Sequence, residues 1–421
     1  MKRVILLIAL TLIFFRTFSQ DSTNKADTLR KDALNVFMEA SDYIRKEIPY
    51  INYVREIKDA GVYIISTSQG TGSGGREFSY FLIGQKENAT MRDTLTFVTS
   101  PDETQDEIRE KEVRTLKMGL MRYVAKTPLS KYMKISFGEP LSEKVETDKW
   151  NSWVYKVSLN GYLDGQQSYK STNLFGNLSA AHVTNKWKTN LSVRYNYGID
   201  KFDVNGDVIT SKNTSKSFNS LIVRSISDHW SFGGTGYIGS SSYNNYNFAA
   251  SLLPGIEYDL FPYSESTRRQ LRLLYTIGYK YANYSDTTIY NLTEEGHFMH
   301  SMSAAYEVIQ KWGSIDLSVN YNNYLHDWSK NNLSVNGYLD LRIAKGLSVS
   351  FGGSASLIHD QLGLVKGGAT TEEVLLRRKE LATQFQYFTS FGLTYTFGSI
   401  YNNVVNPRFG NSGGGGMMIS F

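Results

Sequence analysis

Two His-Asp pairs are the residues of this chain best suited to chemistry. His326-Asp327 and His359-Asp360 each follow a long segment of alternating polar and apolar residues, and His297 and His300 begin another such segment. If these segments are strands, their imidazoles and carboxylates lie at one end of the sheet, which we call the rim. Such a group could bind a metal ion or act as a general base. The alternative interpretation, which we prefer, is that these side chains only form hydrogen bonds at their strand ends, because no nucleophile or second carboxylate is marked out.

Other chemistries find little support. His300, Ser301 and Ser303 lack the His-x-Ser spacing of the barrel phospholipases. The chain has no Cys, which excludes disulfides, thiolate metal sites and the acylated Cys of a lipoprotein. The Gly-rich run 70–75 lacks the Lys-Ser/Thr pair of a P-loop and precedes Arg76-Glu77 and a strand, so we interpret it as a hairpin turn. We expect no cofactor and no metal.

The elements that position these residues are a dozen segments in which every second residue is apolar. Ile315–Tyr321 and Leu333–Ile343 show this most clearly, and a period of two is that of a strand with one apolar and one polar face. Most segments exceed the roughly 9 to 11 residues that a membrane strand needs in lipid. The predicted strands are 152–164, 168–183, 186–199, 216–227, 229–241, 246–261, 267–283, 296–310, 313–326, 332–344, 346–359 and 383–398.

The connections between these segments alternate in length. One set consists of tight turns, at 184–185, 228, 311–312 and 345, and the other set contains the long loops 200–215, 284–295 and 360–382. Short periplasmic turns and long outer loops are the asymmetry of outer-membrane barrels. The pattern therefore predicts which ends of the strands face the periplasm.

Tryptophan gives an independent indication of the same orientation. Four of the six tryptophans start odd-numbered segments, and a fifth lies just ahead of the first segment. Aromatic residues concentrate where a membrane meets water. The sequence therefore predicts a periplasmic aromatic girdle of Trp150, Trp153, Trp187, Trp230 and Trp312.

Ten charged residues lie within the segments, each an odd number of positions from the apolar residues around it. Since successive side chains of a strand point to opposite faces, these charges face the polar side, which is the lumen of a barrel. Five are basic and five are acidic. This balance predicts ion pairs that fill a narrow interior, because a strongly selective open pore more often carries an excess of one sign. The residues are Lys156, Arg194, Glu257, Asp259, Arg272, Lys280, Glu307, Asp316, Asp340 and Arg342.

The chain outside the strands divides into several parts. Residues 1–20 are predicted to be a signal peptide, because Lys2 and Arg3 precede an apolar run too short to cross a membrane. Residues 21–32 are predicted to be mobile, 33–128 to form an α/β domain, 129–150 a connector, and 399–421 a Gly-rich tail or closing strand. The domain is expected to contain a helix from Ala33 to Ile48 and a second helix that begins at Thr104, with a capping box to Glu107.

Several runs of the chain resemble a widespread, uncharacterised family of bacterial outer-membrane proteins that is common in Bacteroidetes. They are Asp42–Arg55, Asp93–Leu95 with Leu116–Ala125, and Phe261–Gln270, and the resemblance covers most of the mature chain. Many members look to have Cys residues just before the first run, where this chain has Met38–Ser41. The resemblance implies a periplasmic α/β domain ahead of a barrel, and it implies no particular activity.

Together these observations predict an α+β periplasmic domain followed by an all-β transmembrane antiparallel barrel of about 12 strands, with 14 as the alternative, over residues 151–398. We expect a structural or interaction role in the outer membrane, or limited passage of small solutes. A surface hydrolase that uses the rim His and Asp residues and a selective transport channel are the alternatives. The expected partners are outer-membrane lipid, the barrel-assembly machinery and an unidentified periplasmic partner. The near-neutral mature chain gives no reason to expect nucleic acid.

Overall fold

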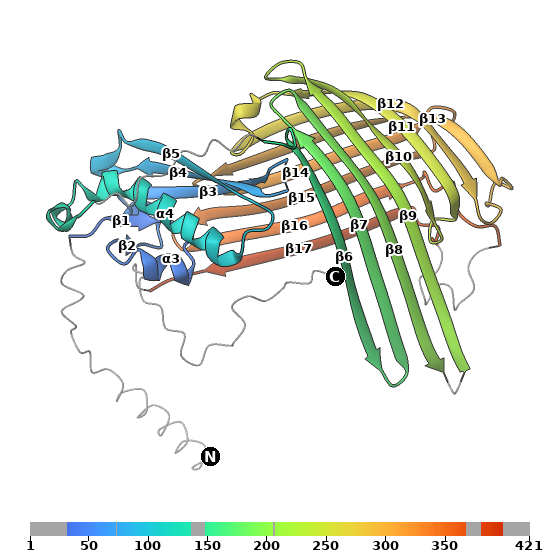
Figure 1. Ribbon diagram of the computed structural model, residues 1–421, viewed down its shortest axis with the longest axis horizontal. Helices are drawn as coiled ribbons and strands as arrows, with labels where there is room; N and C mark the ends of the chain where they lie inside the picture. The colour runs from blue at the N-terminus through green and yellow to red at the C-terminus, as the bar shows by residue number, and fades with distance from the viewer. Residues whose placement is uncertain (1–31, 73, 136–147, 205–206, 368–379, 399–421) are drawn as a thin grey trace, which may run out of the picture.

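The computed structural model describes residues 32–72, 74–135, 148–204, 207–367 and 380–398. The predicted signal peptide, nearly all of the predicted mobile N-terminus, most of the connector and the Gly-rich tail lie outside these ranges. The described residues form a five-stranded sheet with its helices and a twelve-stranded antiparallel sheet (Figure 1). No helix among them is long and apolar enough to cross a membrane.

The N-terminal domain is a mixed sheet that packs against one long helix. Its strand order is β2-β1-β3-β4-β5, in which β1 is parallel to both of its neighbours and β3, β4 and β5 form an antiparallel meander. The strands are β1 (Asn35–Phe37), β2 (Asn52–Tyr53), β3 (Val62–Gly70), β4 (Arg76–Gly84) and β5 (Arg92–Thr99). The helices are α3 (Asp42–Glu47), α4 (Gln105–Val124) and the 3-10 turns η1 (Ile57–Asp59), η2 (Lys86–Asn88) and η3 (Pro128–Tyr132).

The helix predicted from Ala33 to Ile48 is wrong in its first half. Residues 35–37 form strand β1 instead, because the backbone around Val36 pairs with both β2 and β3 while its side chain is completely buried. The helix starts only after Ser41, whose side chain accepts a hydrogen bond from the Ile44 amide. Tertiary pairing thus overrides the helical spacing of the apolar residues.

The core of the domain lies between α4 and the sheet. Leu116 and Leu120 of α4 are fully buried, together with Leu82 of β4. The predicted capping box at the start of α4 is confirmed, since the Thr104 and Glu107 side chains each bond the other's backbone amide. Close packing of a helix on a sheet in this way supplies most of the stability of a small domain.

The second sheet confirms the predicted all-β part of the chain, twelve antiparallel strands that follow an α+β domain. Each strand pairs with the next in sequence, and the sheet curls so that β6–β9 cross in front of β14–β17 (Figure 1). Among the described residues, the outer edges of β6 and β17 carry no strand partner. The strands are β6 (Trp153–Gln166), β7 (Tyr169–Val183), β8 (Trp187–Val204), β9 (Asp207–Ser225), β10 (Trp230–Ser241), β11 (Tyr246–Asp259), β12 (Arg269–Tyr284), β13 (Glu294–Gln310), β14 (Gly313–Tyr324), β15 (Asn331–Ala344), β16 (Leu347–Ile358) and β17 (Phe385–Tyr395), with the 3-10 turn η4 (Tyr263–Glu265) between β11 and β12.

The predicted long loop 200–215 is wrong, because most of its residues belong to β8, which runs to Val204, and to β9, which begins at Asp207. Asp200 pairs with Ser211 and Phe202 with Ile209, so the ladder continues up to Val204 and Asp207. The strands carry polar residues there, and the end of the apolar alternation is the reason that the sequence suggested a loop.

The pairing register gives the sheet one continuous apolar face. Along one row of neighbouring strands, Leu252 lies opposite Tyr279, and Tyr279 lies opposite Phe298. The pattern reaches both edges, where Val157 pairs with Leu178 in β7 and Phe351 pairs with Phe391 in β17. These side chains are exposed, at 66% for Leu252 and 88% for Phe391. The opposite face is polar and lines the concave side of the sheet.

We predict that Leu120→Ala destabilises the N-terminal domain by about 2 to 5 kcal/mol, because the leucine is fully buried and its loss leaves a cavity. Met118→Ala on the same helix is the control, since Met118 is 54% exposed. Pulse proteolysis of the full chain in detergent, across a urea series, measures the urea concentration at which the domain becomes cleavable. Equal midpoints for the two variants would contradict the assigned core.

Candidate functional site

The concave face holds the ten charged residues that the sequence assigned to a lumen, but they do not form the predicted network. The register places all ten on the face opposite the apolar side chains; Lys156 faces Ser179, for example, and Lys280 faces His297. Within the described residues, one ion pair joins two of these ten charges, Arg272 with Glu257 at 3.9 Å. Glu307 and Asp316 lie directly opposite each other, although both are acidic. The described residues therefore do not form the predicted ion-pair network, and several of the charges lie opposite uncharged residues, as Asp340 lies opposite Ser314 and Arg342 opposite Ser348.

The two ends of the sheet differ in their connections. The tight-turn end carries the turns at 184–186, 311–312 and 345–346, and the long-loop end carries the loops 285–293, 325–330 and 359–367. The tryptophans Trp153, Trp187 and Trp230 begin β6, β8 and β10 at the tight-turn end, and Trp312 lies in the turn before β14. Trp150 precedes β6 and is also exposed. The structure thus places all five predicted girdle residues at one end of the sheet.

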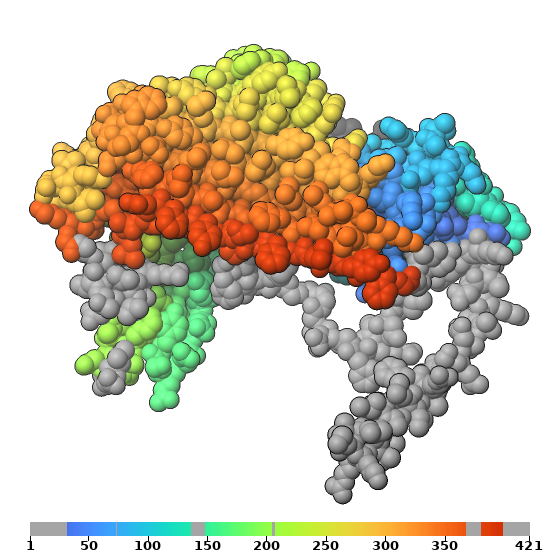
Figure 2. All heavy atoms as spheres, turned by 180° about the vertical axis from the view of Figure 1, so that it is seen from behind, coloured from blue at the N-terminus to red at the C-terminus, as the bar shows by residue number. Residues whose placement is uncertain are grey.

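The N-terminal domain covers this tight-turn end. Figure 2 shows the domain, blue to cyan, seated against the end of the orange and red strands. The β3–β4 hairpin reaches into the concave side, where Gly72 at its turn lies against the Val183 side chain of β7 so closely that any Cβ on Gly72 would clash. On the side of the hairpin away from β7, Ile64 and Ser66 of β3 line the same cavity as Ser314 and Tyr338.

 

Two separate cavities lie on this side of the hairpin. The first, of about 430 Å³, lies between Phe81 of β4 and the turn that carries Arg268. The space shared by β3, β14 and β15 is a second cavity, of about 390 Å³. The hairpin therefore lies between β7 on one side of the concave face and β13–β15 on the other.

Two cation–aromatic contacts fix the domain on the sheet. Arg342 of β15 lies over the Phe37 ring at 4.5 Å and pairs with Glu39 at 3.2 Å. Arg268 lies over the Phe81 ring at 5.1 Å. Arginine over an aromatic face contributes on the order of 0.5 to 2 kcal/mol. One predicted lumen charge, Arg342, thus belongs to the contact between the two parts of the chain.

The long-loop end is covered by a segment from a different part of the chain. Residues 359–367, which follow β16, cross to the loops after β10 and β12, and we call this segment the strap. The Ile289 amide donates to the Leu364 carbonyl at 2.8 Å, and Thr288 forms a β-bridge with Val365. Leu362 and Leu364 are buried. The strap therefore covers part of the concave mouth at this end.

Asn245 joins the three segments of this cover. Its side-chain amide donates to the Asp286 carbonyl at 2.8 Å and to the Gly363 carbonyl at 3.1 Å, and its side-chain oxygen accepts from the Asp286 amide. Its φ of 60° is a left-handed conformation that Asn tolerates better than most residues. Both the side chain and the backbone of this position therefore suit the turn it occupies.

The proposed rim His and Asp residues are not brought together as catalytic pairs. The Asp327 carboxylate accepts from the backbone amide and hydroxyl of Ser329, so it caps its own turn and does not orient His326. His359 lies 3.4 Å from the Asn331 side-chain oxygen, and Asp360 accepts from Asn332. No three His, Asp or Glu side chains of the described ranges converge as metal ligands. The arrangement fits rim hydrogen bonding.

A histidine pair that the sequence did not single out lies at the long-loop end. The rings of His297 and His326 stack with their centroids 3.6 Å apart, and the His297 ring is 2.7 Å from Glu295. Burial, and then the neighbouring His297, hold the pKa of His326 below its ordinary value, against the opposing effect of Asp327 and Glu295. Only the strand register, which brings β13 beside β14, could have revealed this pair.

Comparison with known proteins adds little. No family model matches the chain, and no curated protein matches it. Among solved structures, it is similar to a structure of the NanC porin, with 13% identity and a TM-score of 0.28 over 57% of this chain and 98% of that one. A likeness at that score carries no conclusion about function.

We predict that acidification loosens the 325–330 loop. The pKa of His326 is lowered in the folded protein, so the imidazole binds a proton more readily when the loop is open. The stability that the packing of His326 on His297 gives to the loop is therefore complete above about pH 6.5, and it falls as the pH drops toward the lower pKa of the folded state. Limited proteolysis of the detergent-solubilised protein should cut this loop faster at about pH 5.5 than at about pH 7.5.

His326→Phe is the matched control, since it keeps an aromatic ring against His297 and removes the titrating group. For this variant, the ratio of the cleavage rates at the two pH values should approach the ratio that the same protease shows on an unstructured peptide. If the wild type and this variant show the same ratio, the stacked pair does not respond to pH.

Proposed function

We propose that the chain is an outer-membrane β-barrel protein whose N-terminal domain lies in the periplasm and covers one mouth of the barrel. One observation carries this proposal: the ladder puts apolar side chains of all twelve strands on a single exposed face. Twelve strands spaced about 4.8 Å apart make that face roughly 50 Å wide. Soluble monomers rarely expose apolar patches of more than a few hundred Å².

The ends of the strands support the orientation. Tryptophans gather at the tight-turn end, and Arg224 lies over the Trp187 ring at 5.4 Å. Aromatic and basic side chains together suit the headgroup level of a membrane. The N-terminal domain occupies this same end, so we place the domain and the short turns in the periplasm.

The role that these features favour is structural or interactive, with limited passage of small solutes. The β3–β4 hairpin occupies the concave side at one end, and the strap covers part of the other end. A selective transport channel, the alternative, would require at least one of these covers to move. The surface hydrolase has less support, because the His and Asp residues of the rim form no catalytic pair.

We predict that Gly72→Val raises conductance in planar bilayers. A Cβ at Gly72 would overlap the Val183 side chain, so the hairpin must withdraw from the concave face. Gly70→Val is the matched control, since a Cβ there meets nothing within 4 Å. The wild type and Gly70→Val should show small, infrequent openings, and Gly72→Val should show several-fold larger ones. Equal conductance in all three proteins would contradict the covering role of the hairpin.

A further inference from the structure

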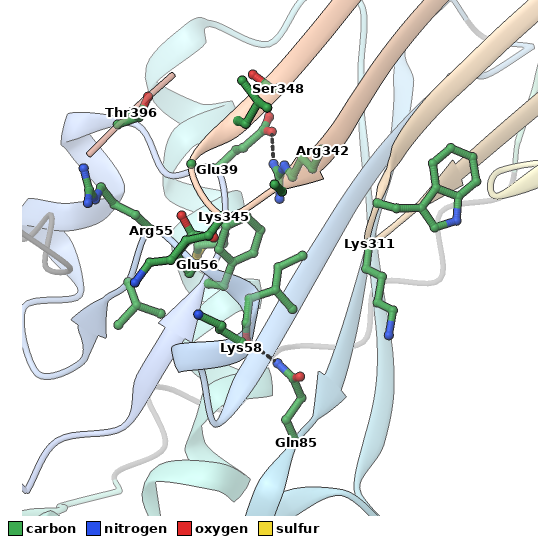
Figure 3. A pocket seen from close by; sticks show the side chains of 18 of the residues that line it. Glu39, Arg55, Glu56, Lys58, Gln85, Lys311, Arg342, Lys345, Ser348 and Thr396 are labelled. Carbon is green, nitrogen blue, oxygen red and sulfur yellow. Dashed lines mark hydrogen bonds and ion pairs between the residues drawn. The ribbon is translucent and has the colours of Figure 1, made fainter. Parts of the chain in front are cut away.

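A basic cleft lies at the junction between the N-terminal domain and the barrel. Its volume is about 740 Å³, and both parts of the chain contribute to its wall (Figure 3). The barrel side comes from the tight turns after β13 and β15, and the domain side comes from the segments before α3 and around η1. We call this cavity the junction cleft.

The lining of the junction cleft carries a large excess of positive charge. Six basic side chains line it, against the acidic residues Glu39 and Glu56. Figure 3 shows Arg55, Lys58 and Lys345 gathered on one side of the cleft, whereas Lys311 lies apart from them. The six basic residues are Arg45, Arg55, Lys58, Lys311, Arg342 and Lys345.

Much of this charge has no ion-pair partner among the residues that the structure describes. Glu39 pairs with Arg342, but within the described ranges no carboxylate lies within ion-pair distance of Lys58, Lys311 or Lys345. Arg55 donates two hydrogen bonds to the carbonyls of residues 397 and 398, and its Nε is buried without a partner. A buried guanidinium nitrogen without an acceptor costs free energy, which an anionic ligand would recover.

The remainder of the wall is apolar and continues onto the outside of the barrel. Phe37, Val54 and Ile57 line the domain side, and the Trp312 indole and Leu347 line the barrel side. Leu347 also pairs with Tyr395, which is 63% exposed on the apolar face. A ligand with a charged head in the cleft could therefore lay an apolar tail along the sheet without crossing a polar surface.

We propose that the junction cleft binds the phosphate headgroup of an anionic phospholipid. This inference rests on the proposed orientation, which puts the tight turns at the level of the inner-leaflet headgroups. The basic residues bind the phosphate, and the apolar wall receives the start of the acyl chains. A bound lipid would join the domain to the barrel, because its headgroup contacts residues of both.

A carboxylate-rich glycan of the cell wall is the main competing ligand, since it also is anionic. It would use the same cations but would gain nothing from Phe37, Trp312 or the route past Leu347. Free phosphate would likewise use only the charge. The apolar half of the wall is therefore the feature that favours a lipid over both.

The test uses native mass spectrometry of the full chain in detergent, titrated with phosphatidylglycerol or with phosphatidylcholine. We expect clear preference for phosphatidylglycerol, and about tenfold weaker binding of it by the double variant Lys58→Gln/Lys345→Gln. The matched control is Lys201→Gln/Lys212→Gln, which removes the same charge from β8 and β9, away from the cleft. This control should bind like the wild type.

Equal affinity for the two lipids, or no loss of binding in the cleft variant, would overturn the proposal. So would a competition experiment in which inorganic phosphate or a peptidoglycan fragment displaces the bound lipid at the same concentration as phosphatidylglycerol does. Because the titration is done in detergent, it does not depend on where the protein resides in the cell. A chain that inserts into lipid bilayers but shows no headgroup preference would disprove the cleft alone and leave the barrel intact.

Discussion

The strict two-residue alternation along each strand is the constraint on which the rest of the structure depends. A slip of one residue in any pairing would move the apolar set of that strand onto the concave face, so the register of all the strands is fixed together. The three register shifts, at Gly239/Ser241, Tyr246/Phe248 and Arg342/Ala344, all fall near strand ends. The apolar face is therefore unbroken over the middle of the sheet, which is where lipid would require it.

The same alternation leaves a polar concave face that other parts of the chain can occupy. Short side chains such as Ser, Asn and Gly dominate it, so there is room for the β3–β4 hairpin at one end and for the strap at the other. The Gly-rich turn 70–75 suits this position, because Gly72 passes Val183 with no space for a side chain. The domain and the barrel thus form one structural unit, joined by Arg342 with Phe37 and by Arg268 with Phe81.

What could be predicted from the sequence followed from local patterns. The period of two gave twelve strands close to their observed bounds, and the capping box at Thr104 marked the start of α4. What could not be predicted depends on contacts between distant residues. The pairing of β1 with β3 turned an apparent helix into a strand, and the stacking of His297 on His326 requires the register of two strands. The balance of charge signs likewise gave no information on which charges meet.

Lipid contact of the apolar face is the central claim, and spin-label accessibility tests it most directly. The chain has no Cys, so single-Cys variants along residues 250–256 of β11 can each be labelled at one position in proteoliposomes. Labels at 250, 252 and 256 should collide readily with oxygen dissolved in the lipid and poorly with a water-soluble nickel complex, and labels at 251, 253 and 255 should not show this oxygen preference. If all positions are equally accessible to the nickel complex, with no alternation, the face is not solvated by lipid and the proposed barrel orientation is wrong.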